Sequence, residues 1–228
     1  MLAWIGPDDP FPPVSRALKE PNGLLAAGGD LSLDRLLDAY RHGIFPWFSR
    51  GEPILWWSPD PRMVLHTAEL KVSRSLAKNL RNKGYRVTVD TAFPEVVQGC
   101  ASRKETWLGK PMQAAYLALH QSGHAHSFET WRGDDLVGGL YGVAVGRMFY
   151  GESMFSRATD ASKVALVTLV KELVGRGFPL IDCQMKTPLL ASLGGREIPR
   201  IAFLRTLTAL VNYDEPLGNW SLTTQKAA

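Results

Sequence analysis

Three strand-like runs lie close together between residues 126 and 155, and they limit the possible folds more than any other part of the chain. The runs cover residues 126–132, 136–145 and 147–155. Only two short turns separate them, and each turn contains a glycine. Loops this short can join only antiparallel neighbours, so the stretch predicts an antiparallel meander.

Helices and strands alternate on both sides of this meander. A short strand is expected at 86–90 and a helix at 112–121, where apolar residues have helical spacing. After the meander, Asp160 is the predicted N-cap of a long apolar helix that ends near Val174. A strand at 180–184 and a helix at 201–211 follow. This order predicts an α+β fold with a mostly antiparallel mixed sheet and flanking helices. By analogy, it is the plan of an N-acetyltransferase-like (GNAT-type) domain.

The first 61 residues have a different character, because they hold nine of the 15 prolines. One helix is expected there, from Ser32 or Asp34 to about His42, with Gly43 ending it. We therefore predict a small, irregular N-terminal domain over residues 1–61, followed by the larger domain over residues 62–228.

Basic residues cluster just after that boundary. The window from Arg62 to Arg86 has seven basic side chains and one acidic one, whereas the whole chain has a net charge of only +4. On a helix, four of these cations would share one stripe opposite Val72, Leu76 and Leu80: Lys71, Arg74, Lys78 and Arg81. Such a stripe fits either a nucleic-acid phosphate backbone or an ordinary solvated helix face.

Several observations bear on the cellular setting. The two cysteines, Cys100 and Cys183, are too few for a disulfide framework. The N-terminus lacks the basic-then-apolar plan of a signal peptide, and no apolar run approaches the roughly 20 residues of a membrane span. We expect a cytoplasmic protein without a membrane partner.

Several common sites are disfavoured by their motifs. Neither a G-x-x-x-x-G-K-[ST] loop nor a G-x-G-x-x-G turn is present. Residues 151–155 resemble a nucleophile elbow, but Phe155 replaces the final glycine. His120, His124 and His126 have no carboxylate or cysteine nearby at metal-ligand spacing, which favours satisfied or surface histidines. The approach to Asp160 lacks the glycine-rich turn that coenzyme A would need.

Two polar residues in an apolar stretch remain. Asp182 and Gln184 are two apart on the expected strand, so they should share one face, with Ile181 and Cys183 on the other. Glu152 belongs to the neighbouring strand or turn. Buried polar groups of this kind form either a structural network or a site, and spacing alone leaves both open.

Longer motifs resemble those of the leucyl/phenylalanyl-tRNA–protein transferase family. The resemblance runs in order from about residue 11 to 205, and these are the motifs that carry it: Glu20-Pro-Asn-Gly-Leu-Leu-Ala, Gly28-Gly-Asp-Leu, Gly43-Ile-Phe-Pro-Trp-Phe, Trp56-Trp-Ser-Pro-Asp-Pro-Arg62, Ala125-His-Ser, Gly138-Gly-Leu-Tyr-Gly142, Gly151-Glu-Ser-Met-Phe-Ser156, Ile181-Asp-Cys-Gln184, Ala191-Ser-Leu-Gly194 and Ile198-Pro-Arg200. One departure is Leu189, where the family pattern has a histidine.

The resemblance implies a bacterial cytosolic aminoacyltransferase that is a monomer and uses no metal or cofactor. Such an enzyme moves leucine or phenylalanine from its tRNA to the α-amine of proteins that begin with arginine or lysine, and methionine is a further candidate donor. The product is marked for degradation. Two hypotheses compete with this one. The chain could be an RNA-binding module that has lost the chemistry, or a small-molecule acyltransferase that uses coenzyme A.

The resemblance also assigns roles to individual residues. Catalysis would involve Asp182, Gln184 and Glu152. Because an amide oxygen is a very poor base, we expect Gln184 to orient the attacking amine, with Asp182 fixing the amide. An apolar aminoacyl pocket would be lined by Leu140, Phe149, Met154, Leu166, Leu169 and Ile181. Trp47 and Trp107 would contact the terminal adenosine of the tRNA, and the basic helix would grip the phosphates of the acceptor stem.

Overall fold

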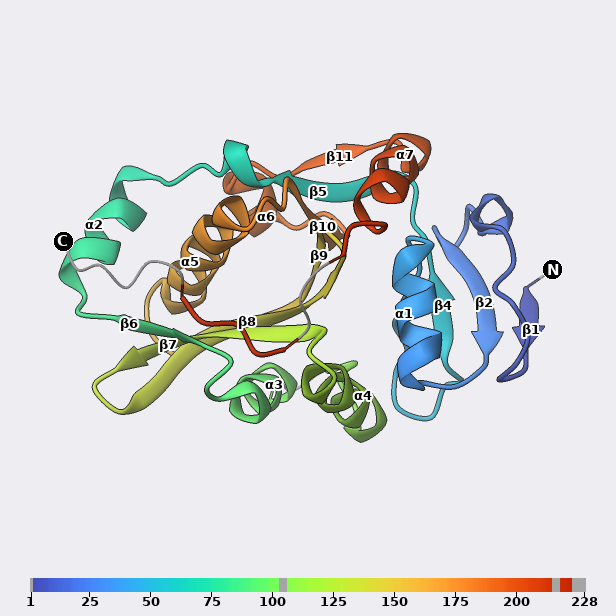
Figure 1. Ribbon diagram of the computed structural model, residues 1–228, viewed down its shortest axis with the longest axis horizontal. Helices are drawn as coiled ribbons and strands as arrows, with labels where there is room; N and C mark the ends of the chain where they lie inside the picture. The colour runs from blue at the N-terminus through green and yellow to red at the C-terminus, as the bar shows by residue number, and fades with distance from the viewer. Residues whose placement is uncertain (1, 103–105, 215–217, 223–228) are drawn as a thin grey trace.

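Two β-sheets organise the chain (Figure 1). The computed structural model describes residues 2–102, 106–214 and 218–222. The smaller sheet has the strand order β1-β2-β4-β3, and the larger has the order β11-β5-β10-β9-β8-β7-β6.

The smaller sheet is built from the N-terminal residues. Its strands are β1 (Ala3–Ile5), β2 (Leu24–Gly28), β3 (Phe45–Pro46) and β4 (Leu55–Trp57). Helix α1 (Leu33–Arg41) lies between this sheet and the rest of the molecule (Figure 1). Ser32 caps α1 by accepting a hydrogen bond from the backbone N–H of Arg35, and Gly43 follows the helix with φ +72°. The predicted N-terminal helix is confirmed.

The larger sheet contains the predicted meander. Strands β6 to β9 pair consecutively and antiparallel, whereas β9 and β10 are parallel because α5 connects them. Its strands are β5 (Arg62–His66), β6 (Arg86–Val89), β7 (Ala125–Arg132), β8 (Asp135–Val145), β9 (Met148–Ser156), β10 (Leu180–Gln184) and β11 (Arg196–Ile198). The predicted α+β class and the mostly antiparallel mixed sheet are confirmed.

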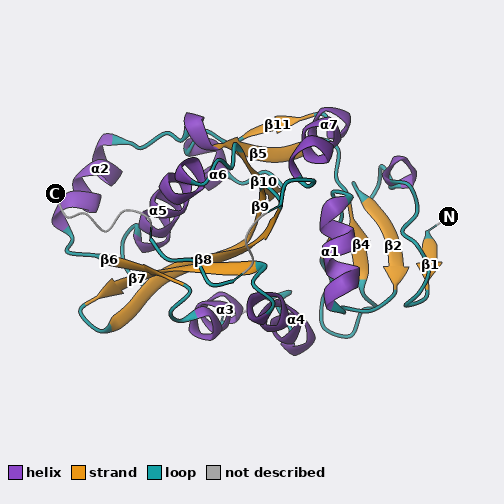
Figure 2. Cartoon of the chain, in the orientation of Figure 1, coloured by secondary structure: helices purple, strands orange, loops and turns teal. Residues whose placement is uncertain are grey.

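Helices cover both faces of the larger sheet (Figure 2). Helices α3 and α4 lie on one face and α5 on the other. Gly138 on β8 lets α5 approach closely, since a Cβ there would lie 2.6 Å from the Cβ of Ala161. The remaining helical bounds are α2 (Arg74–Asn82), α3 (Phe93–Ala101), α4 (Lys110–Gln121), α5 (Ala161–Gly175), α6 (Pro188–Ser192), α7 (Arg200–Leu210), and the 3₁₀ turns Val14–Arg16 and Thr67–Glu69.

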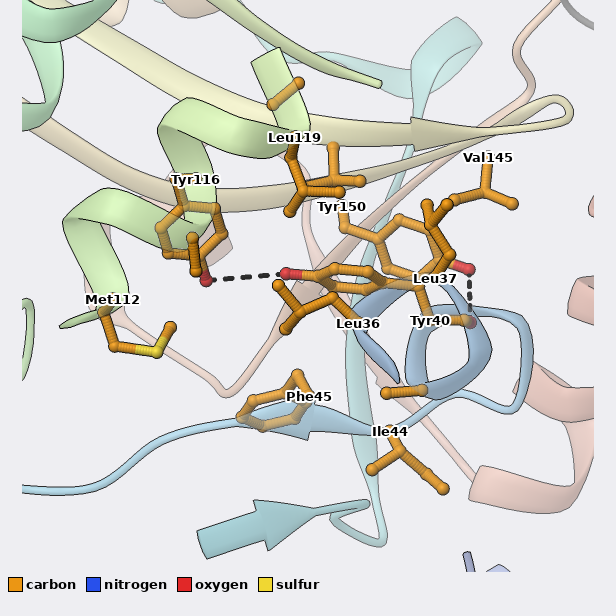
Figure 3. Close-up of a cluster of buried hydrophobic side chains, with 14 of the residues drawn as sticks. Leu36, Leu37, Tyr40, Ile44, Phe45, Met112, Tyr116, Leu119, Val145 and Tyr150 are labelled. Atoms are coloured by element: carbon orange, nitrogen blue, oxygen red, sulfur yellow. Dashed lines mark hydrogen bonds between the residues drawn. The ribbon is translucent and has the colours of Figure 1, made fainter. Parts of the chain in front are cut away.

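Two apolar clusters fill the space between these layers. One joins α1, α3 and α4 to the sheet, and Figure 3 shows the part of it around Tyr40, Tyr116 and Tyr150. The other lies between the sheet and α5, and it includes Phe149, Leu166 and Trp220. In the part of the chain that the structure describes, no helix is long and apolar enough to span a bilayer.

Two local predictions need correction. The basic helix begins at Arg74, because the Ser73 hydroxyl caps it by accepting from the N–H of Leu76. Lys71 and Val72 therefore precede the helix, and Val72 is 39% exposed instead of lying on its apolar face. Asp160 does stand at the start of α5, but its side chain caps nothing. Its backbone is left-handed, with φ 61°, and its carboxylate binds Asn79 and Lys163 instead.

Candidate active site

A cavity of about 370 Å³ opens where β9 and β10 meet α5 and α6. Its apolar walls include five of the six predicted pocket residues: Leu140, Met154, Leu166, Leu169 and Ile181. Leu189 and Leu190 on α6 close another side. A space of this size, lined mainly by apolar side chains with a few polar groups, is typical of small-ligand sites.

Phe149 is the predicted pocket residue that does not line the cavity. Its side chain is fully buried in the cluster beneath α5, where its ring faces Trp220 at a centroid distance of 6.1 Å. The ring occupies space left open by Gly142, since a Cβ there would lie 2.4 Å from the Phe149 ring. Phe149 therefore packs behind the wall of the cavity, and its assignment to the aminoacyl pocket stays a prediction.

Trp47 and Trp107 both line the cavity. Trp47 stands edge-on against Trp57, with centroids 5.4 Å apart, and 37% of Trp47 is exposed. Trp107 stands edge-on against Tyr116 at 6.4 Å. These supports hold both indoles in place, and the exposed part of Trp47 can contact a ligand.

The polar end of the cavity is built around the Glu152 carboxylate on β9. Tyr40 on α1 donates to its Oε1 at 2.8 Å, and Tyr116 on α4 donates to its Oε2 at 2.6 Å. The side-chain amide of Gln184 also donates to Oε1, at 3.1 Å. The two tyrosine hydroxyls point toward each other, with their oxygens 3.4 Å apart (Figure 3). Two helices and the end of strand β10 therefore each supply one donor to this carboxylate.

Burial raises the pKa of Glu152 to about 7. The hydrogen bonds from Tyr116, Tyr40 and Gln184 favour the charged form and oppose this rise, while the nearby Asp182 carboxylate adds to it. Glu152 therefore titrates close to neutral pH, where it can hold a cation or exchange a proton with an amine. Burial also raises the pKa of the Cys183 thiol, which lines the same cavity and so stays protonated and unreactive.

Asp182 and Gln184 are close together but do not present their side chains as regular alternation predicts. The pairing of β10 with β5 shifts register between them, and Gln184 has φ 61°. Gln184 lines the cavity together with Ile181 and Cys183, whereas Asp182 is fully buried and does not. Asp182 Oδ1 accepts from the backbone N–H of Gln184 at 2.8 Å, so it fixes the backbone and not the side-chain amide.

The partner of Asp182 is Arg62, whose side chain is equally buried. Arg62 Nε donates to Oδ1 at 2.8 Å, and Nη2 donates to Oδ2 at 2.6 Å. Arg62 is therefore not part of the solvent-facing basic surface, although it begins the basic window of the sequence.

Sequence reasoning missed Tyr40, Tyr116 and Arg62 as members of this site. The two tyrosines have the spacing of core residues on their helices, and both are fully buried. A usable signal is their chemistry, since a buried tyrosine hydroxyl needs a hydrogen-bond partner. The identity of that partner depends on the fold, because Tyr40 and Glu152 are 112 residues apart.

The predicted RNA-binding cations lie elsewhere. Arg74, Lys78 and Arg81 are exposed on α2, at the end of the molecule opposite the smaller sheet (Figure 1). Lys71 is also exposed, before the helix, and its backbone N–H donates to the carbonyl of Leu193 at 2.9 Å. Leu193 follows α6, so Lys71 lies close to the element that closes one side of the cavity.

The three histidines singled out by the sequence have protein partners. His126 Nδ1 lies 2.8 Å from an oxygen of Asp90, His120 Nδ1 lies 2.8 Å from the carbonyl of Ala125, and His124 Nδ1 lies 3.0 Å from Ser122 Oγ. Within residues 2–102, 106–214 and 218–222, no three His, Cys, Asp or Glu side chains gather as a metal site would require.

Comparisons with known proteins point to one family. The family model described as leucyl/phenylalanyl-tRNA protein transferase matches residues 64–208, and the model of its N-terminal domain matches residues 29–60. The chain is 61% identical over 224 residues to the leucyl/phenylalanyl-tRNA–protein transferase of Chromobacterium violaceum, covering 96% of each chain. It is 63% identical over 215 residues to that of Thiobacillus denitrificans, covering 92% of this chain and 94% of the relative.

Among solved structures, the chain is similar to a GCN5-related N-acetyltransferase from Kribbella flavida. The identity is 11% and the TM-score 0.41, over 70% of this chain and 58% of the other.

Proposed function

Since the chain belongs to the leucyl/phenylalanyl-tRNA–protein transferase family, we propose that its cavity transfers an aminoacyl group from tRNA to the N-terminal amine of a protein. The protein is an aminoacyltransferase. The observation that carries the proposal for the site is the apolar cavity, whose polar end is formed by Glu152 and Gln184.

The donor side chain enters the apolar part of the cavity. Leucine and phenylalanine both fit walls made of aliphatic side chains, and Met154 supports this dual use because its flexible thioether adapts to branched and aromatic groups. Methionine is a third possible donor on the same ground. An apolar pocket discriminates against smaller side chains by about 1–3 kcal/mol for each missing methylene.

The end of the tRNA lies against the two tryptophans. An unpaired terminal adenosine offers its flat face for stacking, and Trp47 and Trp107 supply aromatic surfaces beside the cavity. The exposed cations of α2 bind phosphates of the acceptor stem, an attraction that depends on salt and little on sequence.

The acceptor amine approaches Glu152 and Gln184. An N-terminal ammonium has a pKa of about 8, and the pKa of Glu152 is about 7, so a proton passes between them at little cost. The neutral amine attacks the ester carbonyl carbon and forms an amide bond. The bond to the ribose oxygen breaks, and that oxygen becomes a hydroxyl by taking up the proton that the attacking nitrogen loses. Gln184 Oε1 orients the amine, since the nitrogen of the same amide is held by Glu152. Asp182 supports this arrangement indirectly, because its carboxylate accepts from the backbone N–H of Gln184.

The wider setting of this activity follows the family. We propose that the acceptors are proteins beginning with arginine or lysine, that the added residue marks them for degradation, and that the enzyme works as a monomer in the cytoplasm.

A transfer assay tests this proposal directly. Radiolabelled leucyl-tRNA is incubated with three peptides that differ only in their first residue, which is arginine, lysine or alanine. We expect label on the first two peptides alone, and the same result with phenylalanyl-tRNA. Tight tRNA binding without labelling of any peptide would favour an RNA-binding module that has lost the chemistry.

A further inference from the structure

We propose that Arg62 is a positioning residue for aminoacyl transfer, which acts through Asp182 and the backbone of Gln184 to aim the Gln184 amide at Glu152. The inference rests on the proposed function, because it assigns to Arg62 a part in the same reaction. It also gives Asp182 a supporting role in place of direct contact with the substrate.

The first step is that Asp182 forms a buried ion pair with Arg62. Both carboxylate oxygens accept from the guanidinium, at 2.8 Å and 2.6 Å, and both side chains are fully buried. This bidentate geometry uses the planar fork of arginine, which lysine cannot reproduce. Asp182 does not line the cavity, so it has no direct route to the reacting atoms.

The second step is that Arg62 is itself held on several sides. Its Nη1 donates to the carbonyl of Gly43 at 3.1 Å. Its guanidinium carbon lies 4.8 Å from the ring centre of Phe45 and 4.7 Å from that of Phe203. Gly43 and Phe45 come from the N-terminal part of the chain, and Phe203 comes from α7. Two segments far apart in sequence, residues 43–45 and α7, therefore fix the guanidinium in addition to its contact with Asp182.

The third step links the ion pair to Gln184. Asp182 Oδ1 accepts from the backbone N–H of Gln184 at 2.8 Å, in addition to accepting from Arg62. Gln184 has φ 61°, a left-handed conformation that is unfavourable for a residue with a Cβ. The hydrogen bond that Asp182 accepts from the Gln184 N–H stabilises this conformation at the point where β10 and β5 shift register.

The fourth step is the consequence for the site. The left-handed turn places the Gln184 side chain in the cavity, where its Nε2 donates to Glu152 at 3.1 Å. The contacts therefore form a continuous series. Arg62 binds Asp182, Asp182 binds the backbone of Gln184, and the Gln184 side chain binds Glu152. If Arg62 or Asp182 is altered, Gln184 can relax to an ordinary backbone conformation and turn away from Glu152.

A buried ion pair can also serve stability alone, and removing a single partner typically destabilises the fold, because the other charge is left buried and unpaired. A double-mutant cycle on transfer kinetics separates the two roles. The variants are Arg62→Lys, Gln184→Ala and the double variant, with Arg86→Lys as the matched control, because Arg86 is exposed and outside the site. Each is assayed with leucyl-tRNA and an arginine-initiated peptide, and kcat is corrected for the folded fraction measured by circular dichroism.

We expect Arg62→Lys to lower kcat about 10-fold or more while the KM for leucyl-tRNA stays within about twofold. Because its effect passes through Gln184, adding Arg62→Lys to Gln184→Ala should cause no further loss of kcat. Arg62→Met should lose more activity than Arg62→Lys, and Arg86→Lys should behave as the unaltered protein. Independent, multiplying losses in the double variant would overturn the proposal.

Asp182→Asn provides a second measurement if the Arg62 variants do not fold. Asparagine loses one of the two acceptor oxygens that bind Arg62, so the hold on the Gln184 backbone weakens and kcat should fall. The shape of the pH profile should stay unchanged, because in this proposal Asp182 takes no proton. Loss of one limb of that profile would mean that Asp182 takes the proton, and would overturn the proposal. Absence of transfer by the unaltered protein would contradict the proposed function itself, whereas additivity in an active protein contradicts only the role of Arg62.

Discussion

The Glu152 carboxylate accepts three hydrogen bonds, and its pKa is about 7. Burial raises this pKa and the hydrogen bonds lower it, and the resulting value gives the protein a characteristic pH dependence. The ordinary pKa of a glutamate is 4.5, so between pH 4.5 and about 7 the folded state binds more protons than the unfolded state. The free energy of unfolding should therefore fall as pH rises through this window. We expect Glu152→Gln to flatten this slope, as measured by urea unfolding at intervals from pH 4.5 to 8.

The matched control for this experiment is Glu95→Gln, since Glu95 is exposed on α3. It should leave the slope of the unaltered protein in place. The same slope in the Glu152→Gln variant would show that another group causes the pH dependence.

The pocket wall offers a prediction about donor choice. Leu166 on α5 lines the cavity and is only 5% exposed, so Leu166→Phe should reduce the depth available to a donor side chain. Phenylalanine is bulkier than leucine and should suffer more. We expect the ratio of kcat/KM for phenylalanyl-tRNA to that for leucyl-tRNA to fall about 10-fold or more. Leucyl transfer by the same variant is the internal control, and an equal loss with both donors would mean that Leu166 does not contact the donor side chain.

For individual residues, the sequence motifs pointed to Glu152 and Gln184 at the cavity but not to the residues around them. Five of the six predicted pocket residues line the cavity, while Phe149 turns into the core beside Gly142. The partners of Glu152 could not be predicted, because Tyr40 and Tyr116 lie 112 and 36 residues from it and only the fold brings them together.

Among the elements, those defined by local signals were predicted best. The meander β7–β9 followed from strand-like runs joined by short turns, and α1 followed from its cap and its closing glycine. The start of α2 was misplaced because the charge stripe suggested a longer helix, whereas the Ser73 cap sets the first turn. Helix α3 was not predicted, although its buried Phe93, Val96, Val97 and Cys100 recur at helical spacing.

Helix α2 is the element on which the tRNA prediction depends. Arg74 and Lys78 are exposed on it, and Leu76 buries the opposite side. We expect the double variant Arg74→Gln, Lys78→Gln to bind tRNA more weakly. The plot of log affinity against log salt concentration should lose about one unit of slope for each phosphate contact removed. Filter binding or fluorescence anisotropy at several salt concentrations measures both quantities.

The control for net charge is the double variant Arg16→Gln, Lys19→Gln, which removes two exposed cations from the N-terminal part of the chain. It should leave the salt slope nearly unchanged. Equal slopes for the α2 variant and the unaltered protein would mean that α2 is an ordinary solvated face.

Across the whole molecule, the pairing of distant segments could not be predicted. Strand β5, which begins the larger sheet in sequence, lies between β10 and β11, so residues 62–66 pair with two strands near the other end of the chain. The division into residues 1–61 and 62–228 stays a prediction. Contacts cross that boundary at the site, since Tyr150 Oη donates to the carbonyl of Tyr40 at 2.7 Å and Arg62 donates to that of Gly43.

The C-terminal segment is also part of this long-range arrangement. Trp220, for which the sequence suggested no role, is 5% exposed, and its ring stacks on His126 with centroids 3.8 Å apart. The backbone N–H of Trp220 donates to Asp90 at 2.7 Å, and Arg176 lies over its ring at 4.5 Å. One tryptophan thus joins segments that follow β6 and α5 to the start of β7.

This packing predicts that Trp220 contributes to the stability of the whole fold. Replacing a buried aromatic side chain by alanine typically costs about 3–5 kcal/mol, so Trp220→Ala should lower the free energy of unfolding by about 3 kcal/mol. Trp4→Ala is a control with the same residue type, because Trp4 is 70% exposed on β1 and should change stability by less than about 0.5 kcal/mol. Urea unfolding followed by circular dichroism, which does not depend on the replaced fluorophore, measures both variants. Similar unfolding midpoints for Trp220→Ala and Trp4→Ala would mean that the Trp220 side chain is not packed against the core beneath α5 in solution.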